Sequence, residues 1–329
     1  MDADTQSTRL IVLMPVYCDW KAARIVCDRL DSAVAGTGLA IQVVLVDDGT
    51  PAALREWWAG ETANLSSIDV LVLRRNVGHQ RAIAVGLCYV ADHIGCDAVV
   101  VMDSDGEDKP EDAIRLVHRW MSGERTAVVF AARGKRLENT TFRAGYHAYR
   151  IVHRLLTGIS VRVGNFSVIP FDGVRRLVAM SELWNHYAAA VFRSKLAYEV
   201  EEIDRAPRVH GESRMNFVAL VAHGVSAMAT FSEVVATRIL LSIAVLAVLV
   251  ALAAASAIGI RLTTNWAIPG WTSVTVGLLV LLTVQLAATA FSLMLSVLAS
   301  RAYVTSPPGR DYAWLIDKSV RLASQQREK

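Results

Sequence analysis

The sequence predicts an α/β domain with a mostly parallel sheet, followed by two membrane-spanning helices. In the N-terminal part, short apolar runs alternate with helical stretches, and polar or charged residues follow each run. Near-continuous apolar runs are typical of strands that are buried on both faces of a parallel sheet. Two long stretches without a charged residue come after Arg238, and about 20 apolar residues are enough to cross a bilayer.

Five apolar runs are expected to form strands, at residues 10–14, 43–46, 70–73, 98–102 and 128–131. Helices are expected between them, for example at residues 21–34 and 80–94. Strands that alternate with helices form parallel sheets with right-handed crossovers, and ligands bind such sheets at the carboxyl ends of the strands. The polar residues that follow the runs therefore mark the expected ligand site.

The two uncharged stretches, residues 239–260 and 272–300, are the expected membrane spans. Gln285 is the one strongly polar residue in the second span, and small residues near it favour packing between hairpins in a homo-oligomer. Arg and Lys are frequent after residue 300, so the positive-inside rule predicts that both termini are cytosolic. We expect a multi-pass protein of the cell membrane.

Apolar residues at helical spacing between Phe217 and Val235 predict an amphipathic helix at the membrane surface, with a core helix of the α/β domain as the alternative. The expected organisation is a cytosolic α/β domain at residues 1–213, an interfacial helix at 214–237, a transmembrane hairpin at 238–300 and a cytosolic tail at 301–329. The polar residues 1–9 predict no signal peptide.

Charge and cysteine usage exclude some classes of function. The formal net charge is +3, which does not indicate a nucleic-acid partner. The four cysteines, Cys18, Cys27, Cys88 and Cys96, form no CxxC pair, so we expect reduced thiols without a disulfide or zinc.

The strongest local signal is Asp103-Ser104-Asp105, which directly follows an apolar run. Two carboxylates at positions i and i+2 after a strand can both turn toward a ligand. Hard divalent cations such as Mg²⁺ and Mn²⁺ prefer oxygen ligands of this kind and share them with substrate phosphates. We expect a Mg²⁺ or Mn²⁺ site at Asp103 and Asp105, and the alternative is a solvated acidic turn.

Four motifs occur together in the order that one enzyme family uses. They are Pro15-Val16-Tyr17, Asp47-Asp48-Gly49-Thr50, Arg75-Asn76-Val77-Gly78 and the segment from Asp103 to Glu111. As a set they resemble the family 2 inverting glycosyltransferases of the GT-A fold, a Rossmann-like architecture with helices on both faces of the sheet. The similar branch is the membrane-anchored polyisoprenyl-phosphate glycosyltransferases.

The resemblance implies a role for each matching residue. The nucleotide-sugar donor would be bound by Pro15, Tyr17, Asp19, Asp47, Asp48, Arg75, Asn76, Gly78 and Asp103. The metal would be held by Asp103 and Asp105. The acceptor phosphate would be bound by Arg133, Arg143, Arg208 and Arg214. The residues expected to take part in catalysis are Asp105, Arg133, Arg208 and Ser213, the last from a basic loop that closes over the reaction centre.

The chemistry of a lipid-phosphate acceptor explains why several arginines are expected at the site. The phosphate oxygen is anionic near neutral pH, so it needs positioning by arginine rather than a general base. The sequence departs from its relatives at Glu107 and at His79-Gln80, and His186 lies in an aromatic cluster. If Glu107 or His186 acts as a base, the acceptor is a hydroxyl instead.

Three functions are compared. The first is transfer of a sugar, with UDP-glucose as the expected donor, to a polyprenyl phosphate on the cytosolic leaflet. The second is transfer to a hydroxyl of a glycolipid or polysaccharide, although no Gln-x-x-Arg-Trp motif is present. The third is a non-catalytic membrane scaffold, which the intact motifs disfavour.

Overall fold

The structure, a computed structural model, describes residues 7–133, 154–158, 163–204, 206–210, 228–264, 270–302 and 306–325. The chain divides into two compact units. The α/β unit comprises Met1–Arg143, Val161–Thr230 and Ser306–Lys329, and the helical unit comprises Ala144–Ser160 and Phe231–Thr305. The α/β unit therefore contains segments that come before and after the two long helices in the sequence.

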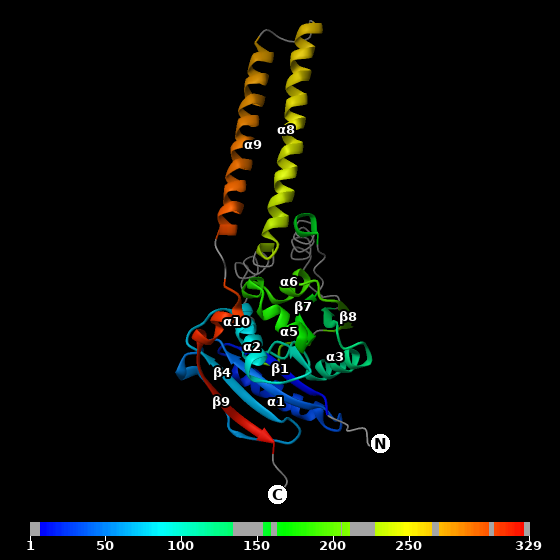
Figure 1. The fold of residues 1–329 in the computed structure, drawn as a ribbon, viewed down its shortest axis with the longest axis vertical. Helices are drawn as coiled ribbons and strands as arrows, with labels where there is room; N and C mark the ends of the chain where they lie inside the picture. The colour runs from blue at the N-terminus through cyan, green and yellow to red at the C-terminus, as the bar shows by residue number, and fades with distance from the viewer. Residues whose placement is uncertain are drawn as a thin grey trace. The chain divides into compact units, whose positions relative to one another are not determined.

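The α/β unit is built on a sheet whose described strands follow the order β3-β9-β4-β2-β1-β5-β7-β6-β8 (Figure 1). The strands are β1 (Arg9–Val16), β2 (Ala40–Asp47), β3 (Gly60–Thr62), β4 (Ser67–Leu73), β5 (Ala98–Val101), β6 (Val128–Arg133), β7 (Val163–Pro170), β8 (Tyr198–Ile203) and β9 (Ile316–Gln325).

The four central strands, β4, β2, β1 and β5, are parallel, in line with the predicted class. The register pairs Leu13 of β1 with Val44 of β2 and with Val101 of β5. These strands are nearly all apolar because helices cover both of their faces. Their carboxyl ends consequently bring the residues after β1, β2 and β5 to one edge of the sheet.

Helices cover the two faces of the sheet as two layers. The described helices of this unit are α1 (Trp20–Val34), α2 (His79–His93), α3 (Pro110–Ser122), α5 (Phe171–Val178), α6 (Tyr187–Arg193) and α10 (Pro308–Asp311), with 3-10 turns η1 (Ala52–Leu54), η2 (Ser181–Trp184) and η3 (Tyr312–Leu315). Leu10 and Val12 of β1 join a core with α1 and α3, whereas Ile11 and Leu13 join a core with α2, α5 and α6. The alternation follows from the two-residue period of a strand.

The five predicted strands and the predicted helices at residues 21–34 and 80–94 are all present, so the predicted α/β class is confirmed. Three strands are not among the predicted apolar runs: β7, which runs antiparallel between β5 and β6, the short strand β3 and the edge strand β8.

The C-terminal segment also contributes to the sheet, a role that the sequence analysis did not assign to it. Strand β9 lies between β3 and β4, and Val320 pairs with Val70 (Figure 1). Arg321 Nε lies 2.7 Å from Asp69 Oδ1, and the Tyr312 hydroxyl donates to Asp92 Oδ2 at 2.7 Å. These contacts anchor the segment after residue 306 to the α/β unit.

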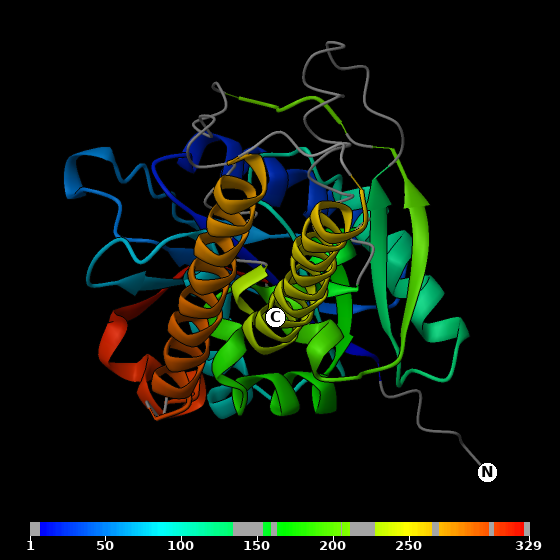
Figure 2. The same cartoon turned by 90° about the horizontal axis from the view of Figure 1, so that it is seen from above.

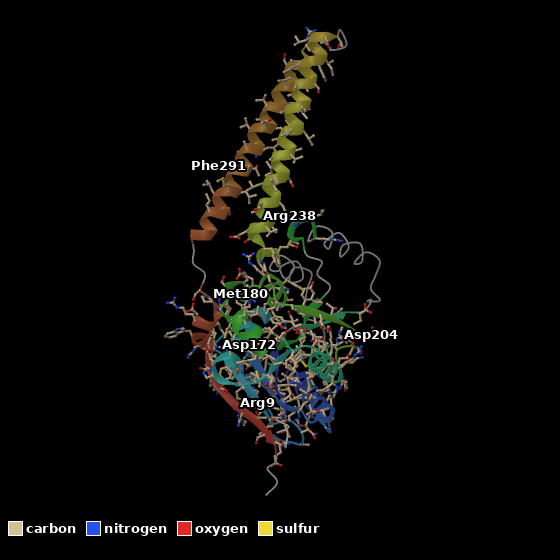
Figure 3. The ribbon with its side chains drawn as sticks, turned by 45° about the vertical axis from the view of Figure 1, so that its right-hand side comes forward. Arg9, Asp172, Met180, Asp204, Arg238 and Phe291 are labelled. Carbon is tan, nitrogen blue, oxygen red and sulfur yellow. The ribbon has the colours of Figure 1, made fainter. Side chains whose placement is uncertain are left out.

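The helical unit contains two long helices, α8 (Ser232–Thr263) and α9 (Trp271–Ala302), which run side by side (Figures 1 and 2). Both are long and apolar enough to cross a membrane. Many of their apolar side chains are exposed; Phe291, labelled in Figure 3, is 63% exposed. Arg238 of α8, also labelled there, donates to the carbonyl of Leu155 at 2.6 Å. The two predicted spans lie inside these helices.

Most of the predicted interfacial helix, through residue 227, lies outside the described residues. Its last part, from Ser232, belongs to the first turns of α8. Within the described residues, that part is therefore continuous with the first long helix.

Candidate active site

The Asp103-Ser104-Asp105 loop follows β5 at the carboxyl edge of the sheet. Its backbone is held in place by its own side chains: Asp103 N donates to Asp108 Oδ2 at 3.0 Å, and Glu107 N donates to Asp105 Oδ1 at 2.9 Å. Ser104 is buried and donates to the carbonyl of Pro15, which joins this loop to the end of β1. The loop is therefore fixed before any ligand binds.

Arg208 joins two of the predicted site carboxylates. Its Nη2 donates to Asp105 Oδ2 at 2.8 Å, and its Nη1 donates to Asp19 Oδ2 at 3.0 Å. Glu107 Oε1 lies 4.0 Å from Arg208 Nε. Because these side chains are mostly shielded from water, the attraction between their charges is stronger than at an exposed surface. Arg208 thus links the ends of β1 and β5.

The segment that carries Arg208 is also paired with the Asp103–Asp105 loop through its backbone. Ala206 N donates to the Glu107 carbonyl and Val209 N to the Asp105 carbonyl, both at 3.1 Å. Gly106 makes this approach possible, because an added Cβ would lie 2.6 Å from Val209 Cγ1. The residue has φ +82°, which also favours glycine.

Asp47, a predicted donor-binding residue, is fully buried and turned inward. Its Oδ1 accepts from Thr50 N at 2.9 Å, and its Oδ2 lies 2.9 Å from Arg55 Nε. A buried carboxylate is stable only when its charge is compensated. Here Oδ1 is hydrogen-bonded to the backbone, and Oδ2 is paired with the charge of the Arg55 guanidinium. In this arrangement Asp47 shapes the turn after β2.

Asp48 holds the loop before α2. Its Oδ1 accepts from Val77 N at 2.7 Å and its Oδ2 from Gly78 N at 3.0 Å. Burial raises the pKa of the Asp48 carboxyl to about 6, and these two hydrogen bonds only partly oppose that effect. The predicted donor residues Arg75 and Asn76 remain exposed on this loop.

The loop after β1 supplies the other predicted donor residues. Tyr17 is 43% exposed, and Cys18 adopts φ +54° while its N–H donates to the Thr50 hydroxyl. Asp19, the N-cap residue of α1, binds Arg208 as described above. A positive φ in a residue other than glycine is uncommon and often occurs at functional sites.

His79, the first residue of α2, lies beside the Asp103–Asp105 loop. Its Nε2 is 3.3 Å from Asp103 Oδ1. Desolvation by the surrounding protein lowers the pKa of His79, but the contact with Asp103 and the negative charges of Asp103, Asp48 and Asp105 together outweigh that effect, so the pKa is raised. Asn165 Nδ2 of β7 lies 3.0 Å from the same ring nitrogen. In the sequence, this position stands out only as a departure from the relatives.

The Asp103 and Asp105 carboxylates fit a divalent cation that is shared with a ligand. No three His, Cys, Asp or Glu side chains in the described part of the chain form a complete metal cluster. Two carboxylates at one loop would therefore leave further positions to phosphate oxygens and water, as Mg²⁺ and Mn²⁺ sites with nucleotide substrates do. Arg208 supplies positive charge beside these carboxylates in the structure, and the His79 ring lies next to Asp103.

Several predicted residues lie outside the described residues: Arg143, Ser213 and Arg214. The backbone of Arg133 ends β6 opposite Ile203, but its side chain is not described. His186 is buried and caps α6, accepting from Ala189 N at 3.5 Å. That contact is a structural role of the kind expected for a capping residue.

Arg55 is a site residue that the sequence analysis missed. It reaches Asp47 from the segment after η1, and its guanidinium lies 5.8 Å from the centre of the Trp57 ring. An arginine close to two tryptophans after a buried acidic strand end was the available signal in the sequence.

Comparison with known proteins identifies the family of this chain. Residues 11–178 match the sequence profile of Glycosyl transferase family 2. An uncharacterized glycosyltransferase, YkcC of Bacillus subtilis (strain 168), is 25% identical over 230 residues, 68% of each chain. Undecaprenyl-phosphate 4-deoxy-4-formamido-L-arabinose transferase of Klebsiella pneumoniae (strain 342) is 26% identical over 220 residues, 65% of this chain and 64% of that one.

The chain thus spans about two thirds of the length of these curated relatives. Among solved structures, glucosyl-3-phosphoglycerate synthase from Mycobacterium tuberculosis gives a TM-score of 0.49 at 16% identity, over 70% of this chain and 80% of that one. The family profile covers more than half of this chain, including β1, β2 and the Asp103–Asp105 loop. The chain therefore belongs to glycosyl transferase family 2.

Proposed function

We propose that this protein is a metal-dependent glycosyltransferase that moves a sugar from a nucleotide-sugar donor to a polyprenyl phosphate on the cytosolic leaflet of the cell membrane. The observation that carries the proposal is the assembly of Asp103, Asp105 and Arg208 at the carboxyl edge of the sheet. Carboxylates for a metal and an arginine for phosphate are what the transfer of a sugar from a diphosphate requires. UDP-glucose is the first donor to test.

The donor is assigned to the cluster of loops after β1, β2 and β5. Tyr17 and Asp19 are exposed enough to contact the nucleoside, and Arg75 and Asn76 border the same edge. Asp47 and Asp48 are buried and would not contact the donor themselves. Their side chains hold the turn after β2 and the loop before α2 through hydrogen bonds to the backbone. When bound, Mg²⁺ or Mn²⁺ would supply Lewis-acid stabilisation to the diphosphate from its place at Asp103 and Asp105.

The acceptor is assigned from chemistry and from the relatives. The undecaprenyl-phosphate transferases among them act, by name, with an undecaprenyl phosphate. Such a phosphate is anionic near neutral pH, because its second pKa lies near 6. Arg208, Arg133, Arg143 and Arg214 would orient this phosphate, and Ser213 is assigned a part in catalysis.

The reaction follows as a single displacement. An acceptor phosphate oxygen attacks the anomeric carbon, a new carbon–oxygen bond forms, and the bond from that carbon to the β-phosphate oxygen breaks with inversion. The electron pair leaves with the nucleoside diphosphate, so no proton has to be removed from the acceptor. Arg208 stabilises negative charge on the phosphates as it redistributes.

Membrane attachment supports a lipid acceptor. The chain enters α8 after the α/β unit and returns to that unit as β9 after α9. If both helices cross the bilayer, the chain before α8 and the chain after α9 are on the same side of the membrane. The basic residues after residue 300 assign that side to the cytosol. Anchoring the site at the membrane raises the effective concentration of a lipid substrate.

A transfer assay tests the proposal. Full-length protein in detergent receives radiolabelled nucleotide sugars singly, Mg²⁺ or Mn²⁺, and undecaprenyl phosphate, with Asp105→Asn as control. We expect label in the organic phase that depends on the metal and on Asp105. Donor binding without lipid labelling would favour a hydroxyl acceptor, and the absence of any donor binding would favour a scaffold.

A further inference from the structure

Trp314 is the most exposed of the large apolar side chains in the described part of the chain, at 82%. It lies on η3, between the buried residue Tyr312 and the start of β9. A single exposed apolar side chain is common on protein surfaces and needs no partner. The surroundings of Trp314 therefore decide whether it marks an interaction surface.

The segment that carries Trp314 is held firmly on the α/β unit. The Tyr312 hydroxyl donates to Asp92 Oδ2 at 2.7 Å, and Arg74 N donates to the Leu315 carbonyl at 2.9 Å. These contacts fix the backbone on both sides of Trp314. The exposed indole is therefore a feature of the folded surface and does not belong to a loose chain end.

This segment lies at the edge of the sheet that holds the candidate active site. Strand β9 begins beside the carboxyl end of β4, where Ile316 pairs with Leu73. The Asp103–Asp105 loop follows β5, and β5 is parallel to β4 in the same sheet. An enzyme that acts on a lipid phosphate has to present this edge to the membrane.

The chain connection brings the segment close to the end of a predicted membrane span. Helix α9 has 32 residues and is about 48 Å long, whereas a bilayer with its headgroups is about 40–45 Å thick. A spanning α9 therefore ends, at Ala302, near headgroup level. Three residues separate Ala302 from Ser306, whose carbonyl accepts from Trp184 Nε1 of the α/β unit at 3.1 Å. Such a connection reaches at most about 14 Å.

Basic side chains surround the exposed tryptophan. Arg310 of α10 is exposed and lies four residues earlier, about one helical turn away. Helix α10 packs against the end of α5, because a Cβ added to Gly309 would lie 3.1 Å from the Val178 carbonyl. The last turn of α5 carries Arg175 and Arg176, and both are exposed. Three guanidinium groups thus lie on α10 and on the helix end that it contacts.

An indole beside guanidinium groups is the combination that a membrane interface binds. Tryptophan is enriched at headgroup level, because its ring is apolar and its N–H is polar. Arginine forms charge-assisted hydrogen bonds with lipid phosphates and is attracted by an anionic leaflet. The acidic residue Asp311 offsets one of the three positive charges, so the surface of α10 and the end of α5 keeps a net positive charge.

We propose that Trp314 and Arg310 form a membrane-contact surface, in which the indole enters the headgroup region and Arg310 binds the phosphates of anionic lipids. The inference rests on the proposed attachment through α8 and α9. The chain connects the α/β unit to these helices at two places, and a body held at two points can still rotate about the line between them. A third contact at Trp314 restricts that rotation and keeps the carboxyl edge of the sheet toward the lipid.

A spin label beside Trp314 measures the contact without relying on turnover. Ala313, which is exposed, is replaced by Cys in a Cys18→Ser background, because the other three cysteines are buried. Full-length labelled protein is placed in nanodiscs of phosphatidylcholine and phosphatidylglycerol, and power saturation measures collisions of the label with oxygen and with Ni-EDDA. We expect lower Ni-EDDA access and higher oxygen access than for a label at Glu124→Cys, an exposed position in the loop before β6, at the opposite edge of the sheet.

Substitutions at two positions identify the groups that make the contact. In the Ala313 label background, Trp314→Asp is expected to raise Ni-EDDA access to the level at Glu124, and Trp314→Tyr, which keeps an amphipathic ring, should retain the protection. Arg310→Gln should remove the additional protection that phosphatidylglycerol gives over phosphatidylcholine alone, whereas Arg119→Gln at the end of α3 should not. Thermal midpoints should stay unchanged in the Trp314 variants, because the side chain is exposed.

The outcomes separate this inference from the function on which it rests. Equal Ni-EDDA access at Ala313 and Glu124, in a protein that glycosylates undecaprenyl phosphate, would overturn the membrane contact and leave the proposed function intact. Protection that survives Trp314→Asp, or that comes with dipolar broadening between the labels of two copies, would also overturn the contact. Protection that depends on Trp314, in a protein that transfers no sugar to a lipid, would support the contact and count against the proposed function.

Discussion

Arg208 Nη2 donates to Asp105 Oδ2 across 2.8 Å, and the same guanidinium binds Asp19 at 3.0 Å. One side chain from the segment after β8 thus holds the loops after β1 and β5 together. Arg208, a predicted phosphate-binding residue, therefore contacts Asp105, a predicted metal ligand. Replacing Arg208 is the most informative test of the candidate site.

Replacing Arg208 with Lys is expected to lower the rate of sugar transfer by about 10–100-fold, because each charge-assisted hydrogen bond contributes about 1.5–3 kcal/mol. An ammonium cannot reproduce the two-pronged contact with Asp105 and Asp19. Initial rates at saturating donor measure the change. Arg193→Lys, which removes the guanidinium Nε contact with Glu182 away from the site, is the control. Equal losses in both variants would contradict the assignment.

Gly49 is expected to tolerate no side chain. Its φ is +71°, and an added Cβ would lie 2.3 Å from Asn76 N and 2.4 Å from Arg75 C. Gly36 has φ +73° but no atom within 4 Å of such a Cβ. Both Gly→Ala changes cost about 1–2 kcal/mol for the backbone conformation, and only Gly49→Ala adds the clash. Thermal midpoints of the two variants should therefore differ, with Gly49→Ala the lower, and equal midpoints would argue against the packing of the two loops.

A proline in β9 is expected to destabilise the α/β unit by about 3 kcal/mol or more, because β9 pairs with β4 along most of its length and proline disrupts such a ladder. Val320→Pro is the variant, and Val320→Ala is the control that keeps the backbone N–H. The measurement is the thermal midpoint of the full-length protein in detergent. If the two variants unfold together, β9 does not contribute to the stability of the sheet.

Asp48 predicts a pH dependence of stability. Its pKa is raised by burial to about 6 in the folded protein, above the ordinary value of 3.8. The folded state then binds more protons than the unfolded state between pH 4 and 6, so this group's contribution to stability falls as the pH rises through that range, by up to about 3 kcal/mol.

Asp48→Asn removes the titrating group, which gives the measurement. The difference in thermal midpoint between wild type and Asp48→Asn is expected to shift against the wild type as the pH rises from 4 to 6. A difference that is constant across this range would show that Asp48 does not titrate there.

The central strands were predictable because their pattern is local. Apolar runs such as residues 43–46 are bounded by polar residues, and burial on both faces follows from the run itself. Strand β7 carries Gly164, Asn165 and Ser167 between its apolar residues, which hides it from a search for apolar runs. Strand β9 pairs with residues more than two hundred positions earlier, and no local pattern encodes that distance.

The candidate site was predictable in composition and less so in orientation. The motifs identified Asp47 and Asp48 as site residues, but only the structure shows that both turn inward to hold loops. The hydrogen bond from the Gln80 amide to Asn165 joins α2 to β7, and the two residues lie 85 positions apart in the sequence. Such a contact depends on the tertiary fold, because neither residue belongs to a recognisable motif.

The central claim is that the acceptor is a lipid phosphate, and a paired-acceptor assay tests it most directly. Full-length protein in detergent receives the donor that it binds, Mn²⁺, and either undecaprenyl phosphate or undecaprenol at equal concentration, and mass spectrometry identifies the product. We predict a glycosylated lipid phosphate from the first acceptor and no glycosylated lipid from the second. Glycosylation of undecaprenol at a comparable rate would contradict the claim, as would an unmodified lipid phosphate in the presence of bound donor.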